Sequence, residues 1–267
     1  MCERIYAGTV EQPFTSVWTR EPRPAKSPGL GRDQIVRTAM ALLDAEGVDA
    51  LSMRRLGARL GSGATSIYWH VASKDELLEL VMDEVFGEVS LPDPGAAGWR
   101  GTALAVAYGL RNALFAHPWA ASLIGTRPAI GPNAVRLAAR MLDAFERAGF
   151  REAQLDYASA ALLSFVLGAT APEVAWQTAL RRSEATEEEV LRATREMVAQ
   201  VARDHPGLVA RHKAYDAKDI GAERALSFDF GLSCLLDGLE ARLAAPDGAP
   251  RQTGTSSPAG QARSDMM

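Results

Sequence analysis

The side chains best suited to chemistry in this chain are cations and hydroxyls that lie close together between Ser52 and Lys74. This stretch contains four basic residues and no acidic one, although the whole chain has a net charge of −4 at pH 7. The four cations are Arg54, Arg55, Arg59 and Lys74. A local basic patch on an acidic body is typical of a protein that meets DNA through one face, because the rest of its surface repels phosphates.

The same stretch has the pattern of two short helices. Ser52 is a good N-cap for a helix with Leu56 and Leu60 on one face, and Gly61 can take the left-handed conformation that ends it. A second helix is predicted from about Ala64 to His70. Two short helices joined by a glycine turn predict a helix-turn-helix.

These residues carry a resemblance to a known family. The order Arg55-Leu-Gly-Ala-Arg-Leu-Gly61, followed by Ile67-Tyr-Trp-His-Val71, resembles the tetracycline-repressor (TetR) family of bacterial transcription factors. The likeness runs from Arg32 to Val85, and a weaker one, centred on Gly125-Thr-Arg-Pro128, extends to about Leu243. It implies an all-α fold, with an N-terminal three-helix helix-turn-helix domain for DNA and a larger C-terminal helical domain for ligand binding and dimerisation.

Each residue of the motif has an expected role. Arg54 can reach a guanine edge, the alternative being a phosphate contact or a solvated charge. Arg55 and Arg59 are expected to be solvated or to face phosphates. The resemblance implies phosphate contacts for Tyr68, His70 and Lys74, although His70 alone can also be read as structural. The complete set of expected DNA-binding residues is Ser52, Arg54, Ala64, Thr65, Ser66, Tyr68, Trp69, His70 and Lys74.

Residues 1–31 lack helical periodicity and are rich in proline, which predicts a disordered arm. The arm is either a solvated leader or a minor-groove arm beside the helix-turn-helix. Its candidate groove contacts are Arg20, Arg23, Lys26 and Arg32. Phe14, Val17 and Trp18 are unusual in a solvated leader, so this part is a candidate for docking on the folded body.

The remaining chain divides at Leu91–Gly98, where prolines and glycines interrupt the helical pattern. Residues 32–90 form the DNA-binding domain, in which Asp33 caps the first helix and a capping box of Ser73 and Glu76 opens a connector helix. Residues 98–244 form the ligand-binding and dimerisation domain, with one helix expected to stop at Pro172. Residues 245–267 are expected to be a disordered tail.

Two helices of the larger domain, around residues 155–166 and 226–239, have very wide apolar faces. These apolar faces either pack in the core of one subunit or, as the resemblance implies, form the four-helix interface of a homodimer. The candidates for a ligand pocket, each of which can equally be plain core, are Tyr108, Leu110, Leu114, Trp119, Leu123, Phe165 and Trp176.

The expected ligand differs from that of the tetracycline repressors. In those proteins a histidine just before Gly-Thr-Arg-Pro holds a magnesium–tetracycline chelate, and Leu123 stands at this position here. Their acidic metal-side contact falls near Pro172, where only Glu173 is close. We therefore expect no metal and an effector that is apolar or aromatic in part.

The sequence favours a ligand-responsive repressor that binds a palindromic operator as a homodimer. A transcriptional activator or an architectural DNA-binding protein without effector would share most of these features. We find no phosphate-binding glycine loop, nucleophile elbow or metal-ligand spacing, and therefore expect neither an enzyme nor a cofactor. By our reading no apolar run is long enough to cross a bilayer, and the two cysteines, Cys2 and Cys234, lie far apart, so we expect the bacterial cytoplasm.

Overall fold

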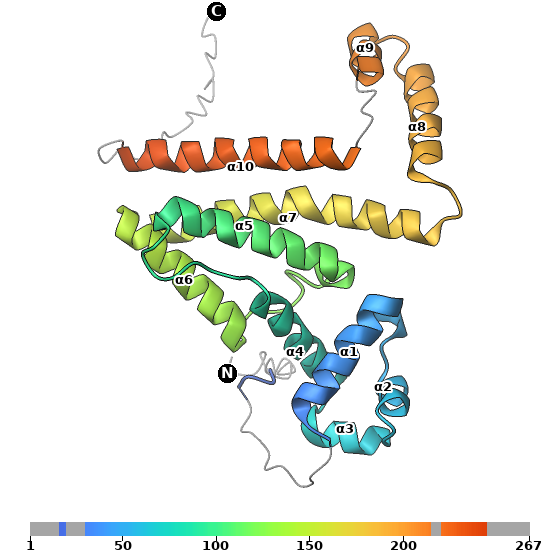
Figure 1. Cartoon of the computed structure of the whole chain (residues 1–267), viewed down its shortest axis with the longest axis vertical. Helices are drawn as coiled ribbons and strands as arrows, with labels where there is room; N and C mark the ends of the chain where they lie inside the picture. Colours follow the sequence, from blue (N-terminus) through green and yellow to red (C-terminus); the bar gives the residue numbers. More distant parts are fainter. Residues whose placement is uncertain (1–15, 20–29, 215–219, 245–267) are drawn as a thin grey trace, which may run out of the picture.

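The structure, a computed structural model, describes residues 16–19, 30–214 and 220–244. Over these ranges the chain is built from helices, and its β-structure is limited to an isolated bridge between Ile124 and Arg127 (Figure 1). The predicted all-α fold is confirmed. The expectations for Phe14, for the arm residues Arg20, Arg23 and Lys26, and for the tail 245–267 lie outside the described residues.

The DNA-binding end consists of α1 (Arg32–Glu46), the short 3-10 helix η1 (Val48–Ala50), α2 (Met53–Arg59) and α3 (Ala64–His70). Ile35, Leu42, Leu56 and Ile67 are fully buried where these helices meet. The predicted cap at Asp33 is wrong, because Gly31 is the N-cap residue and Asp33 lies in the first turn. There its negative charge still stabilises the positive end of the helix dipole.

Helix α4 (Lys74–Gly87) connects this end to the rest of the molecule. The Ser73 hydroxyl accepts a hydrogen bond from the Glu76 N–H at 3.0 Å, as the predicted capping box requires. The Glu76 carboxylate accepts from the N–H of Ala72 at 2.8 Å, one residue before the expected cap. The start of α4 is thereby joined to the segment that follows α3.

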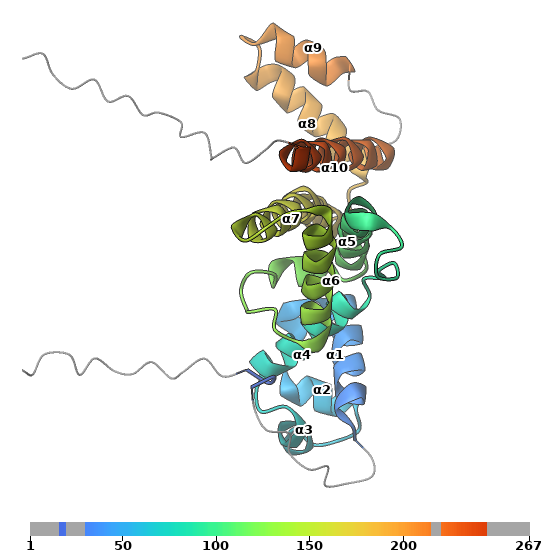
Figure 2. The same cartoon turned by 90° about the vertical axis from the view of Figure 1, so that its left-hand side faces the viewer.

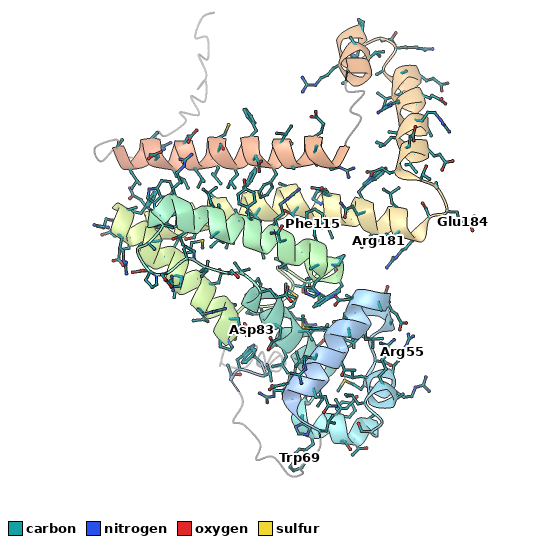
Figure 3. All side chains as sticks on the ribbon, in the orientation of Figure 1. Arg55, Trp69, Asp83, Phe115, Arg181 and Glu184 are labelled. Carbon is teal, nitrogen blue, oxygen red and sulfur yellow. The ribbon has the colours of Figure 1, made fainter. Side chains whose placement is uncertain are left out.

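Two further carboxylates on α4 are buried. Asp83 accepts from the N–H groups of Asn133 at 3.1 Å and Ala134 at 3.0 Å, so it caps the start of α6 (Figure 3). The approach is so close that a Cβ on Gly131 would lie 2.3 Å from the Asp83 carboxylate. Glu79, one turn earlier, accepts from Ser16 and Val17 of the N-terminal segment.

The larger domain has its layers stacked away from the DNA-binding end. Figures 1 and 2 show α5 and α7 between the connector and α10, while α8 and α9 project from one side. Its helices are α5 (Gly98–Ala116), η2 (Pro118–Ser122), α6 (Pro132–Ala148), α7 (Ala153–Arg182), α8 (Glu187–Val201), α9 (Pro206–Ala214) and α10 (Ile220–Ala244).

Helix α7 does not stop at Pro172. It continues to Arg182 with the proline inside it. Proline removes one backbone hydrogen bond and strains the preceding turn, but buried residues lie on both sides of it, Val166 before and Val174 after. Packing of both halves against the domain outweighs the local preference to end the helix.

By length and composition, α7 is also apolar enough to cross a bilayer, contrary to the expectation that no segment of this chain is. Only 28% of its most apolar 18-residue window is buried inside the subunit. Much of the apolar surface of α7 is therefore left uncovered by the helices around it.

The Asp83 cap yields a stability prediction. Replacing Asp83 by alanine leaves two N–H groups at the start of α6 without their acceptor, and we expect a loss of about 0.5–2 kcal/mol in unfolding free energy. Asp83→Asn keeps an acceptor and should lose less. Urea unfolding followed by circular dichroism measures both, with Asp93→Ala in the exposed loop after α4 as the control. Equal stability of Asp83→Ala and the control would contradict the role of this cap.

Candidate nucleic-acid interface and effector domain

The helix-turn-helix forms through short-range contacts. The Ser52 hydroxyl accepts from the N–H of Arg55 at 3.2 Å and caps α2 as predicted. Gly61 has a φ of +63°, the left-handed conformation that ends α2 and that side chains with a Cβ rarely adopt. Ile67 is fully buried and fixes α3 to the domain core.

Helix α3 presents neutral donors to solvent. Thr65, Ser66, Tyr68 and Trp69 are exposed, and Figure 3 shows Trp69 at the far end of the molecule, opposite α10. Ala64 and His70 are half-buried at the two ends of the same helix. Hydroxyl and indole groups at such a surface can donate to phosphates or to base edges.

The cations of the patch differ in their surroundings. Arg55 and Arg59 both form ion pairs with Glu46 at the end of α1, the second at 2.9 Å. Both arginine side chains remain exposed, at 48% and 43%, as expected, and their ion pairs with Glu46 connect α2 to the end of α1. Arg54 lies on the exposed side of α2.

Two other expected contacts lie at the edges of this surface. The Lys74 ammonium donates to the backbone carbonyl of Val48 at 3.3 Å, so it joins the start of α4 to η1. Arg32, the one candidate groove contact that lies among the described residues, is half-buried in the first turn of α1.

A polar cluster joins the two domains beside α1. The two ring nitrogens of His117, which follows α5, lie 2.7 Å from Asp44 on α1 and 2.9 Å from Glu88 after α4. The Trp119 indole N–H donates to the same Asp44 carboxylate at 2.6 Å. One aspartate thus binds α1 to two residues of the larger domain.

The two carboxylates beside His117 favour the protonated form of its ring. Burial by itself lowers the pKa of His117, but the hydrogen bonds and charges of Asp44 and Glu88 outweigh burial and raise the pKa above its ordinary value. The protonated ring can donate from both nitrogens at once, one to each carboxylate. The sequence does not single out His117, because its partners lie 73 and 29 residues away and leave no local signal.

The residues expected to line a ligand pocket spread over the larger domain. Leu110, Leu114 and Trp119 are buried core residues, whereas Leu123 lies beside a small cavity next to α4. The others contact neighbouring helices: Tyr108 of α5 donates to Asp229 of α10, Phe165 of α7 packs on Phe228 of α10, and Trp176 of α7 donates to Glu187 at the start of α8.

A buried ion pair lies among them. Arg111 on α5 donates to Glu173 on α7 at 2.7 Å, and both side chains are only 11% exposed. The Arg111 guanidinium also lies over the rings of Phe115 and Phe228, at 4.9 Å and 4.4 Å from their centres. The charge of Arg111 is thus balanced by Glu173 and by cation–π contacts with two phenyl rings, which stabilises the packing of α5 against α7 and α10.

The cavities in the described part of the molecule include two of interest. The one beside α4 has a volume of about 50 Å³ and is walled by Trp18, Phe86, Leu123 and Pro128 among others. A wider, open groove of about 740 Å³ runs between α1, α4 and α6, where Asp44, Glu88 and His117 lie. The first is far smaller than the roughly 300–1,000 Å³ that drug-sized ligands occupy.

The known proteins that this chain resembles are transcription regulators. Residues 35–81 match the family model "Bacterial regulatory proteins, tetR family", and residues 91–243 match "Tetracyclin repressor-like, C-terminal domain". An HTH-type transcriptional regulator of Saccharopolyspora erythraea is 38% identical over 90% of this chain and 98% of that protein. The transcriptional repressor DrrR1 of Streptomyces coeruleorubidus is 32% identical over 89% of this chain and 88% of that protein. Among solved structures, ActR of Streptomyces coelicolor in complex with actinorhodin is similar, with a TM-score of 0.67 at 30% identity, over 82% of this chain and all of that one.

The His117 cluster yields a pH prediction. A histidine whose pKa is raised on folding stabilises the protein fully below its unfolded pKa of about 6.5, and the stabilisation is lost as pH rises through the raised value. We therefore expect the melting temperature of the protein to fall relative to His117→Gln across this window. Thermal unfolding between pH 6 and 9 measures it, with the exposed His205→Gln as the control. Parallel pH curves for the protein and His117→Gln would contradict this coupling.

Proposed function

Because the chain belongs to the TetR family of transcription regulators, with a helix-turn-helix domain and a ligand-binding domain, we propose that it is a dimeric repressor released from its operator by a small molecule. The observation that carries the proposal is the exposed face of α3. Thr65 and Ser66 are exposed there, and Trp69 lies at the end of the molecule opposite α10 (Figure 3). A helix presented in this way can enter the major groove.

We assign the reading of bases to Arg54 and the start of α3. Ala64, Thr65 and Ser66 are too short to discriminate strongly, whereas the long fork of Arg54 can donate two hydrogen bonds to a guanine. Tyr68, Trp69, His70 and Lys74 are assigned to phosphates, where they set the register of the helix. Ser52 caps α2 and contributes its hydroxyl at the same edge.

The proposed homodimer forms through α7 and α10. Three large apolar side chains on these helices are strongly exposed in the single subunit: Tyr157 (71%), Leu226 (61%) and Phe230 (73%). Leu226 and Phe230 are four residues apart on α10 and so share one side of that helix. Large exposed apolar side chains of this kind, together with the uncovered apolar surface of α7, favour a protein partner. A two-fold dimer would place two α3 helices in successive major grooves of a palindrome about 34 Å apart.

The proposed effector binds in the larger domain and acts through α4. Leu123 stands where a magnesium ligand would be needed, and its side chain has no donor atom, so the effector is not a magnesium–tetracycline chelate. Because Arg111 is already paired with Glu173, the effector is expected to be bound mainly by apolar and aromatic contacts. The likeness to the repressor DrrR1 and to ActR with its bound actinorhodin supports repression and a small-molecule effector.

One prediction separates base reading from phosphate contact. Arg54→Ala should cost about 1–3 kcal/mol in operator affinity and relax the preference for one base pair. Lys74→Ala should weaken binding to all sequences alike. Selection from random DNA by the purified proteins, followed by binding titrations, measures both effects. An unchanged base preference in Arg54→Ala would refute its assignment.

A second prediction concerns the dimer. A glutamate at position 230 would place a charge in the proposed apolar interface, so Phe230→Glu should be a folded monomer with greatly weakened operator binding. Val135→Glu makes the same change at an exposed apolar residue of α6 and should leave the dimer intact. Analytical ultracentrifugation gives the oligomeric state of each variant. A dimeric Phe230→Glu protein would place the interface elsewhere.

A further inference from the structure

A short N-terminal segment is packed against the connector helix (Figures 1 and 2). Ser16 and Val17 are only 1% and 4% exposed. The segment forms its own turn, in which the Thr19 N–H and hydroxyl both donate to the Ser16 carbonyl, at 3.2 and 3.1 Å. The sequence left the docking of this part of the chain open, and for Val17 and Trp18 it is confirmed.

The polar part of this docking is a buried carboxylate. Glu79 of α4 is 5% exposed, and its Oε2 accepts from the Ser16 hydroxyl at 2.5 Å and from the Val17 N–H at 3.1 Å. Both donors are neutral groups. A buried carboxylate is costly unless donors compensate it, and charged donors form stronger hydrogen bonds with it than neutral ones. An ammonium group in this place would therefore satisfy Glu79 more fully than the chain's own segment does.

The apolar part of the docking is the ring of Trp18. It is half-buried and forms one wall of the cavity beside α4, with Phe86, Leu123 and Pro128 among the other walls. An indole thus lies in the same cleft as the Glu79 carboxylate. Without the Trp18 side chain, the cleft would be open to solvent and would have room for another flat aromatic ring.

The charges around the cleft favour a cation. Among the described residues that wall the cavity, the acids are Glu79 and Asp83 and the base is Arg127. The Arg127 guanidinium already donates to Asp75 at 2.7 Å. Asp83 is held by the start of α6, so Glu79 is the acceptor that a ligand could use. Two acids against one paired base give the cleft a net negative charge, which attracts positively charged ligands.

We propose that this cleft is a binding site for aromatic amines and that the chain's own Ser16–Trp18 segment keeps it closed. The ammonium group binds Glu79 in place of the two neutral donors, and the ring takes the place of the indole. The walls of the cleft do not include Arg111, so this site is additional to the effector site proposed above. A ligand here competes with the segment and contacts α4, the helix that connects the two domains.

The first test uses the full chain and tryptamine, which carries an indole and an ammonium group on a short linker. In the double variant Ser16→Ala/Trp18→Ala the segment no longer fills the cleft, so tryptamine should bind at least about tenfold more tightly than it binds the parent protein. Isothermal titration calorimetry at neutral pH measures both affinities. Ser90→Ala, a change of an exposed serine just after α4, is the control and should bind tryptamine like the parent. Equal affinities of the double variant and the parent would overturn the proposal.

The second test concerns the charge. Indole-3-propionate has the same ring with a carboxylate in place of the ammonium, so it should bind the double variant at least about tenfold more weakly than tryptamine does. Adding Glu79→Gln to the double variant keeps the shape of the cleft and removes its charge, and the tryptamine affinity should fall by about tenfold. Equal binding of the two indoles, or an unchanged affinity with Glu79→Gln, would overturn the assignment of Glu79.

The double variant removes a donor from Glu79 and should be less stable than the parent. Circular dichroism shows whether it folds. If it does not, Ser16→Ala alone takes its place, with a smaller gain in tryptamine affinity expected and no gain contradicting the proposal. Hydrogen–deuterium exchange of the parent is an independent check on the closed segment, because rapid exchange of the Val17 amide would overturn it. None of these measurements involves DNA, so their outcome does not depend on the proposed repressor function.

Discussion

The arrangement of this molecule depends on a row of buried carboxylates along α4. Glu76, Glu79 and Asp83 lie at spacings of three and four residues, which places them on one side of the helix. Each is compensated by donors from a different part of the chain: the segment after α3, the N-terminal segment and the start of α6. Because an unpaired buried carboxylate is costly, the three elements are held to one helix and to one another. A rigid connector of this kind can transmit a displacement.

The charge at the DNA-binding end is distributed differently from what the sequence alone indicates. Glu46 forms ion pairs with both Arg55 and Arg59, and the Lys74 ammonium donates a hydrogen bond to a backbone carbonyl. These contacts stabilise the helix-turn-helix before any ligand arrives. The exposed face of α3 is then left with hydroxyl, phenol and indole groups, which position a helix through geometry more than through net charge.

Prediction from sequence succeeded where the signal is local. Ser52, Gly61 and Ser73 act within three or four residues of themselves, and the structure has α2, α3 and α4 where these residues place them. Prediction failed where contacts with residues distant in the sequence determine the local structure. Pro172 was expected to end α7, but packing on both sides carries the helix through it.

The same limit applies to the candidate sites. Asp44 and His117 are separated by 73 residues and Ser16 and Glu79 by 63, so neither spacing nor periodicity brings them together. The ion pairs of Arg55 and Arg59 with Glu46 join two different helices, so helical spacing does not predict them. A sequence specifies such pairs only through the complete fold.

The small size of the cavity beside α4 bears on how an effector could act. A space of about 50 Å³ does not admit a drug-sized molecule, so binding there would require a more open arrangement of the larger domain. A ligand shifts an equilibrium only by its difference in affinity for the two arrangements. The closed arrangement is held at two junctions, Asp83 with the start of α6 and Asp44 with His117 and Trp119. An opening that breaks either junction must displace α4 or α1, and both belong to the DNA-binding end. DNA that favours the closed arrangement would then weaken effector binding by the same factor, because the coupling between two sites is reciprocal.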